Sequence, residues 1–169
     1  TKTTKVIAQL ICVVLVGIAY NNLVNSLPVA VKIRENSVIK EIKNDLTSLK
    51  APQKEVPELA NAVYTAHQST GLNPKLITSL MYTESKFNKN AIGPSNRTNI
   101  RYKGLLQTPT ATSFSDVDTL HGARILKEKL DMTDQNLRSA LALYKGGNNP
   151  TAFRQADIVL ALYHKLQKD

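Results

Sequence analysis

Glu84 is the residue whose type and position could do chemistry, in the stretch LMYTESKFN. It follows Ile77 by seven residues and Met81 by three, so it extends the apolar face of a helix predicted over residues 74–86. Burial and the carboxyl end of a helix both raise the pKa of a carboxyl group. A carboxylic acid that keeps its proton can donate it to a leaving oxygen. The common alternative is a glutamate that reaches solvent at the end of a helix.

Two other segments carry groups that could act beside such an acid. Tyr144 ends an apolar helical face in LRSALALYKGG, and its phenol could reach a carboxyl on a neighbouring helix. A core tyrosine with its hydroxyl at the surface is the alternative. In YKGLLQTPTAT, Gly104 allows backbone to approach a ligand, and the Gln107 amide offers a donor and an acceptor. An ordinary turn before a helix is the alternative there.

Taken in order, these segments resemble the lysozyme-like lytic transglycosylases, the soluble lytic transglycosylase catalytic-domain family. That family shows a Glu-Ser motif ending in Phe-Asn, then a GLMQ-type motif, then an AYNAG-type motif. The resemblance covers about residues 57–165 and implies a mainly α, lysozyme-like domain with minimal β structure. The matching segments here are ESKFN (84–88), GLLQ (104–107), ALALYKGG (140–147) and, for a helix with a central Gly-Ala, DTLHGARIL (118–126).

The resemblance also implies the site. Glu84 would be the catalytic acid and later the base, and Ser85 would help to position the acid or the substrate amide. Tyr144 would hydrogen-bond Glu84 or the sugar, while Lys145 stands where the family usually has Asn. The stretch QTPTAT is shorter than the family's. The implied substrate-binding residues are Ser85, Gly104, Leu105, Leu106, Gln107, Tyr144 and Lys145.

A single-acid mechanism fits better than a pair of carboxylates. The other acids near the motifs, Asp116, Asp118 and Asp131, match no catalytic motif, and the first two are typical of helix starts. By similarity, Glu84 would protonate the oxygen between N-acetylmuramic acid and N-acetylglucosamine and then close a 1,6-anhydro ring. Hydrolysis by water, as in lysozymes, is the alternative. We expect no metal and no organic cofactor, because the three histidines lack metal-ligand spacing.

The N-terminal part carries a candidate membrane segment. Residues 6–31 contain no charge, and the apolar core of this run, residues 6–24, is just long enough to cross a bilayer as a helix of ~20 residues. We expect residues 1–31 to be a retained anchor, with a cleaved signal peptide or a helix buried in a larger assembly as the alternatives. The short basic tail would stay inside, which places the bulk of the chain on the periplasmic or wall-facing side.

The rest of the chain is predicted to form a linker and one helical domain. Residues 32–54 include an amphipathic helix over 35–50, which could be a stalk, a self-association seam or a cover for the domain. Ala51-Pro52 predicts the boundary to a domain over 55–169. The domain's predicted helices span 57–70, 74–86, 116–131, 133–145 and 151–168, with an irregular loop, and room for a small hairpin, over 88–113.

The net charge of +9 suits an anionic partner such as a cell-wall polymer or a lipid surface. The basic residues are scattered, so we do not expect nucleic acid as a partner. The leading hypothesis is a membrane-anchored enzyme that opens peptidoglycan locally, in a phage virion at genome entry or in a bacterial secretion machine, beside other proteins of that complex. Its alternatives are a non-catalytic peptidoglycan-binding or structural membrane protein and a membrane-tethered regulator.

Overall fold

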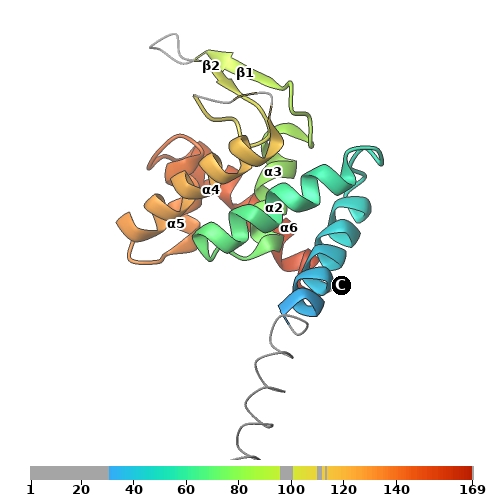
Figure 1. The fold of residues 1–169 in the computed structure, drawn as a ribbon. Helices are drawn as coiled ribbons and strands as arrows, with labels where there is room; N and C mark the ends of the chain where they lie inside the picture. Colours follow the sequence, from blue (N-terminus) through green and yellow to red (C-terminus); the bar gives the residue numbers. More distant parts are fainter. Residues whose placement is uncertain (1–30, 96–100, 110–111, 113, 169) are drawn as a thin grey trace, which may run out of the picture. The chain divides into compact units, whose positions relative to one another are not determined.

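The computed structural model describes residues 31–95, 101–109, 112 and 114–168 (Figure 1). The chain divides into two compact units, Thr1–Val38 and Ile39–Asp169. In the first unit, the described residues 31–38 are helical. The expected membrane segment over residues 6–24 lies outside the described residues. Among the residues that are described, no helix has the length and apolar character needed to cross a bilayer.

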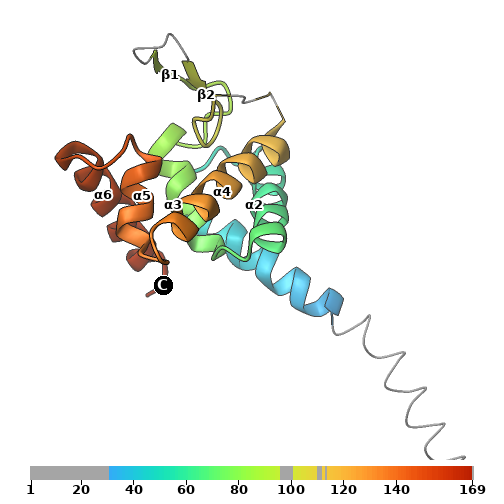
Figure 2. The same cartoon turned by 90° about the vertical axis from the view of Figure 1, so that its left-hand side faces the viewer.

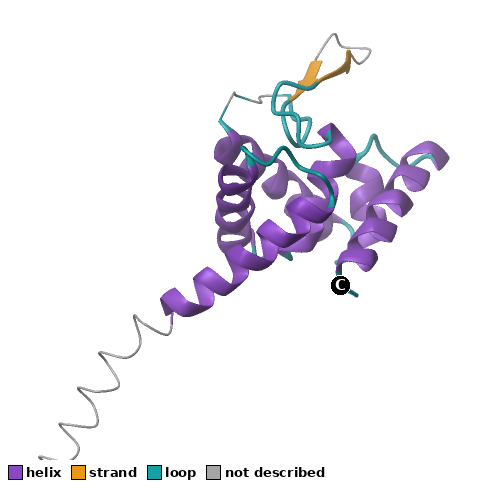
Figure 3. Ribbon diagram, turned by 90° about the vertical axis from the view of Figure 1, so that its right-hand side faces the viewer, coloured by secondary structure: helices purple, strands orange, loops and turns teal. Residues whose placement is uncertain are grey.

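The second unit is mainly helical, as the sequence predicts, and its two short strands lie at one end of the helices (Figure 3). It begins with helical residues 39–48. The strands pair antiparallel, with Ile92 opposite Lys103. The elements that follow residue 50 are α2 (Val56–Thr70), α3 (Pro74–Ser85), β1 (Ile92–Ser95), β2 (Arg101–Lys103), α4 (Ser115–Met132), α5 (Leu137–Tyr144) and α6 (Pro150–Leu166).

Helix α3 begins where the sequence predicts and is fixed in the core. The Asn73 side chain accepts a hydrogen bond from the Lys75 backbone N–H, and Pro74 takes the first helical turn. The helix contacts α2, α4 and α6 (Figure 2). Leu80 and Met81 are fully buried on its inner side. The carboxyl end of α3 is therefore held in a fixed position.

Helix α5 begins later than predicted. The expected start near Thr133 is wrong, because Thr133 ends α4 and its hydroxyl donates to the Lys129 carbonyl. Asp134 and Gln135 then take positive φ angles of 49° and 64°, which breaks the helix. Asn136 caps α5 by accepting a hydrogen bond from the Ser139 backbone N–H.

Residues 39–48 belong to the larger unit, so the two units divide ahead of the predicted boundary at Ala51-Pro52. Ile42 and Leu46 are 1% and 0% exposed. The Lys75 ammonium lies 3.1 Å from a carboxylate oxygen of Asp45 and 3.1 Å from one of Glu41. Of the three roles considered for this amphipathic segment, these contacts favour a cover for the domain.

Candidate active site

The chain turns sharply directly after Glu84. Lys86 and Phe87 both adopt left-handed backbone conformations, with φ angles of 54° and 66°. Such angles are costly for residues other than glycine and persist where packing holds them. The Phe87 ring is 1% exposed and packs against Tyr82, with ring centroids 5.6 Å apart. This turn ends α3 and leaves Glu84 in its last turn.

Glu84 forms a largely buried ion pair with Lys145. The Lys145 ammonium lies 2.9 Å from a Glu84 carboxylate oxygen, and the two side chains are 7% and 14% exposed. The same ammonium donates to the Thr83 hydroxyl at 3.2 Å. Burial raises the pKa of Glu84 above its ordinary value, while the charge and hydrogen bond of Lys145 offset part of that rise. A carboxyl with a raised pKa can act as a proton donor.

A pocket of about 340 Å³ opens beside this pair. Glu84 is its only carboxylate among the described lining residues, which are Thr83, Glu84, Lys86, Lys145, Gln155 and Ile158. Gln155 and Ile158 come from α6, and the sequence analysis missed both because they belong to no motif. One signal in the structure marks Ile158, since 60% of this apolar residue is exposed.

Tyr144 connects α5 to the GLLQ loop. Its hydroxyl donates to the Leu106 carbonyl at 2.7 Å, so its proton is directed at the loop backbone and not at Glu84. Burial raises the pKa of Tyr144 well above its ordinary value, and the charge of Glu84 adds to the rise. The phenol therefore stays protonated and its oxygen lies in the electrostatic field of Glu84.

Gly122 makes room for this connection. A methyl group at Gly122 would lie 2.5 Å from Leu106 Cβ and 2.9 Å from the Tyr144 hydroxyl. Helix α4 can approach the loop only because this position has no side chain. The Gly-Ala pair in DTLHGARIL indicated this helix, and the structure adds what the glycine does.

The GLLQ loop is closed by its own backbone. Lys103 and Thr108 exchange two backbone hydrogen bonds of 3.1 and 3.0 Å across it. Leu105 and Leu106 are both 0% exposed, so neither residue presents its side chain or its backbone at the surface of this structure. Gly104 takes a positive φ of 77° and lines a second pocket, of about 330 Å³, at the base of the hairpin.

The side chains of Gln107 and Ser85, two predicted substrate contacts, are bonded to the protein backbone. The Gln107 amide nitrogen donates to the carbonyls of Ala91 and Gly104, at 3.2 and 2.9 Å, and Gln107 does not line the pocket beside Glu84. The Ser85 hydroxyl donates to the Met81 carbonyl within α3 at 3.2 Å. In the structure, Gln107 holds the base of the hairpin and Ser85 is bonded to its own helix.

The remaining acids near the motifs have other partners. The buried Asp118 accepts hydrogen bonds from the backbone and the hydroxyl of Thr112. Asp116 bonds the Val117 backbone N–H, and Asp131 bonds Lys127 and Gln135. None of the three acids lines the Glu84 pocket. In the described part of the chain, no group of three or more His, Cys, Asp and Glu side chains could hold a metal ion.

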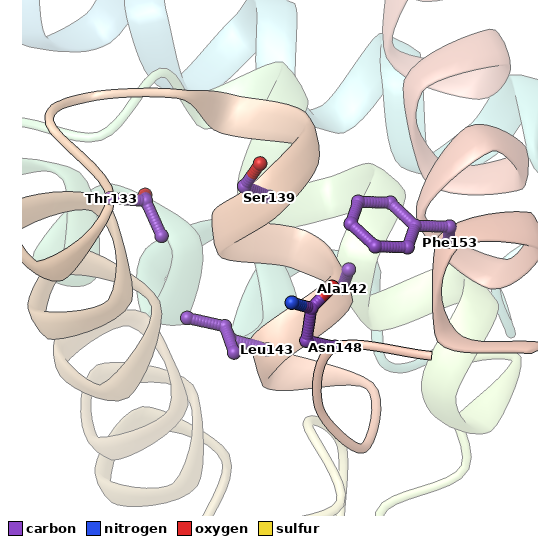
Figure 4. Close-up of a pocket in the computed structure, with 6 residues that line it drawn as sticks. All are labelled: Thr133, Ser139, Ala142, Leu143, Asn148 and Phe153. Atoms are coloured by element: carbon purple, nitrogen blue, oxygen red, sulfur yellow. The ribbon is translucent and has the colours of Figure 1, made fainter. Parts of the chain in front are cut away.

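A third pocket, of about 120 Å³, is lined by residues of α5 and of the segments before and after it (Figure 4). Its described lining carries no charged side chain and consists of Thr133, Ser139, Ala142, Leu143, Asn148 and Phe153. It offers no acid or base, so the Glu84 pocket is the better candidate for chemistry.

Comparison with known protein families gave a match. The family model of the transglycosylase SLT domain matches residues 61–157, which is more than half of the chain and includes all the motif residues. No curated protein and no solved structure gave a significant match.

Proposed function

Because the chain belongs to the transglycosylase SLT domain family, whose members cleave peptidoglycan lytically, we propose that Glu84 is its single catalytic acid and base. The observation that carries the proposal is the largely buried carboxyl at the end of α3, facing a pocket with no second carboxylate among its described lining residues. The pKa of Glu84 is raised by that burial, as proton donation requires.

The proposed reaction needs only Glu84 and the substrate's own groups. The Glu84 carboxylic acid gives its proton to the oxygen that links N-acetylmuramic acid to N-acetylglucosamine, and the bond from that oxygen to C1 breaks. The acetamido oxygen of the muramyl unit stabilises the positive charge at C1. The Glu84 carboxylate then takes the proton of the muramyl 6-hydroxyl, whose oxygen closes the 1,6-anhydro ring. Attack by water in place of the 6-hydroxyl would give hydrolysis.

Substitution of the acid tests this proposal. In Glu84→Gln we expect cleavage of purified peptidoglycan to fall by about 10²–10⁴-fold or more, since one group serves as both acid and base. The variant should fold, because glutamine fills the same space. Mass spectrometry of the wild-type products would show anhydro or reducing ends. Cleavage by Glu84→Gln at the wild-type rate would refute the role of Glu84.

The same experiment decides between the enzyme and its main alternative. A non-catalytic peptidoglycan-binding protein on this fold would bind purified peptidoglycan and release no fragments, in the wild type as in Glu84→Gln. The replacement of the family's Asn by Lys145 is the feature that favours this alternative. The raised pKa of Glu84 beside its pocket favours the enzyme.

We also propose that residues 6–24 anchor the protein in a membrane, with the catalytic domain on the periplasmic or wall-facing side. The support is the uncharged, apolar run in the sequence. An anchored enzyme would open the wall locally, in a phage virion at genome entry or within a bacterial secretion complex. The full chain should stay with the membrane after alkaline carbonate extraction. An arginine at the centre of a membrane-spanning helix costs ~2.5–3.5 kcal/mol of insertion free energy, so Leu15→Arg should release part of the protein from the membrane. Complete extraction of the wild type would refute the anchor.

A further inference from the structure

The pocket beside Glu84 holds more positive than negative charge. Lys145 and Lys86 line it together with Glu84, while its other described lining residues are uncharged. Lys86 lies 3.7 Å above the Tyr82 ring, and no carboxylate of the described residues forms an ion pair with it. When Glu84 is ionised, the pocket therefore keeps one excess positive charge, and it attracts an anionic group.

Lys145 works against the acid role of Glu84 in the unoccupied pocket. An ammonium 2.9 Å from a carboxylate stabilises the ionised form. Lys145 is also bonded to Thr83, so α3 holds it through two consecutive residues. Another anion that pairs with Lys145 in place of Glu84 would remove this opposing effect and make it easier for Glu84 to take up the proton that it must later donate.

We propose that a carboxylate of the substrate takes this place: it binds Lys145 and Lys86 in the pocket and releases Glu84 to accept a proton from solvent. This inference rests on the proposed function. The carboxylate has two possible sources, the lactyl group of a muramyl unit without a stem peptide and a carboxylate of the stem peptide. The substrate class is then a glycan strand that carries a free carboxylate next to the bond to be cut.

Lys145 is the specificity-determining residue in this account. The family's Asn at this position could donate a hydrogen bond, but it would neither favour the ionised form of Glu84 by charge nor attract a carboxylate by charge. The charge requirement is thus a property of this chain, and it arises from one side chain that is 7% exposed.

The test compares substrates that differ only in charge. Peptide-free glycan strands with a free lactyl carboxylate are compared with the same strands after conversion of that group to the methylamide. We expect the wild type to prefer the free carboxylate in kcat/KM by about tenfold or more, the worth of one charge-assisted contact. Strands with stem peptides, with free or amidated peptide carboxylates, distinguish the two sources.

Lys145→Asn should remove the preference, so that its kcat/KM values for the charged and the neutral strand become equal. Lys168→Asn removes one charge at an exposed position after the end of α6, outside the lining of the Glu84 pocket, and should behave as the wild type. If Lys145→Asn does not fold, Lys145→Gln serves as a second variant. Equal wild-type rates on both strands, or a preference that survives without Lys145, would overturn the inference.

Binding gives a readout that is independent of catalysis. Calorimetry with the Glu84→Gln variant should show tighter binding of a short strand with the free carboxylate than of its methylamide. If the wild type cleaves no strand but this difference in binding is present, the proposed function fails and the carboxylate site stands. If strands are cleaved and bound without regard to charge, the site fails and the proposed function stands.

Discussion

Two largely buried lysine–carboxylate pairs lie among the residues that the structure describes, and they differ in what surrounds them. Lys75 pairs with Asp45 and Glu41, which joins the start of α3 to the residues before α2. Lys145 pairs with Glu84 at the other end of α3. The first lysine has two carboxylate partners and lines none of the described pockets, whereas the second has one and lines a pocket of about 340 Å³. A satisfied pair stabilises a fold, and an incompletely balanced pair at a pocket is suited to chemistry.

The pKa shifts follow the same difference. Burial lowers the pKa of Lys75, but the hydrogen bonds and charges of Glu41 and Asp45 outweigh it, so its pKa is raised. Burial raises the pKa of Glu84, and one lysine does not cancel it. The shift in the pKa of Lys75 thus favours its charged form, whereas the shift in the pKa of Glu84 favours its protonated form.

The largest expected effect on stability comes from breaking the Lys75 pair. Lys75→Met removes the ammonium from Asp45, whose side chain is 8% exposed, and we expect a loss of about 3 kcal/mol in the free energy of unfolding. Urea denaturation measures it. The pH dependence of cleavage by the folded fraction should not change, because Lys75 does not line the Glu84 pocket. A shifted pH profile would show that the two pairs are not independent.

A second prediction disturbs the packing next to the second pair. Gly122→Ala places a methyl group against Leu106 and the Tyr144 hydroxyl, and we expect a loss of about 1–3 kcal/mol in stability. Cleavage by the folded fraction should fall as well, because Tyr144 and the loop are displaced. Arg124→Ala, at an exposed position on the same helix, is the matched control. Wild-type stability in Gly122→Ala would mean that α4 and the loop approach less closely than described.

The smallest expected effect on stability comes from Lys145→Met, and it depends on pH. The folded-state pKa of Glu84 is already above its ordinary value of 4.5, and loss of Lys145 raises it further. A raised carboxyl pKa contributes stability that is fully present below the unfolded value and is lost as pH rises through the folded value. The deficit of the variant should therefore be small at low pH and grow as pH rises through the folded-state pKa of Glu84. A deficit that shrinks with rising pH would contradict the pairing.

The sequence predicted the elements whose signals are local. Asn73-Pro74 predicted the start of α3, and the apolar periodicity predicted that Glu84 lies at the end of a buried face. The start of α5 was predicted wrongly, because Thr133 resembles a helix start while its hydroxyl in fact closes α4. Helix starts and buried helix faces can be predicted in this way because capping and periodicity depend on residues only a few positions apart.

The contacts that make the site join residues far apart in the chain, and no local sequence pattern predicts them. Lys145 was recognised as a departure from the family, but its ion pair with Glu84 joins residues on two helices. Ile158 and Gln155 were missed because α6 reaches the pocket only after packing against α3 and α5. The burial of Ile42 and Leu46, which places residues 39–48 in the larger unit, also depends on tertiary packing.

The most direct test is a titration of the Glu84 carboxyl carbon by NMR in the wild type and in Lys145→Met. The account predicts a wild-type pKa above the ordinary value of 4.5, and a higher pKa in the variant, because burial raises it and Lys145 lowers it. A pKa at or below the ordinary value, or one that does not move when Lys145 is lost, would contradict the claim that burial raises the pKa of this acid against the effect of Lys145.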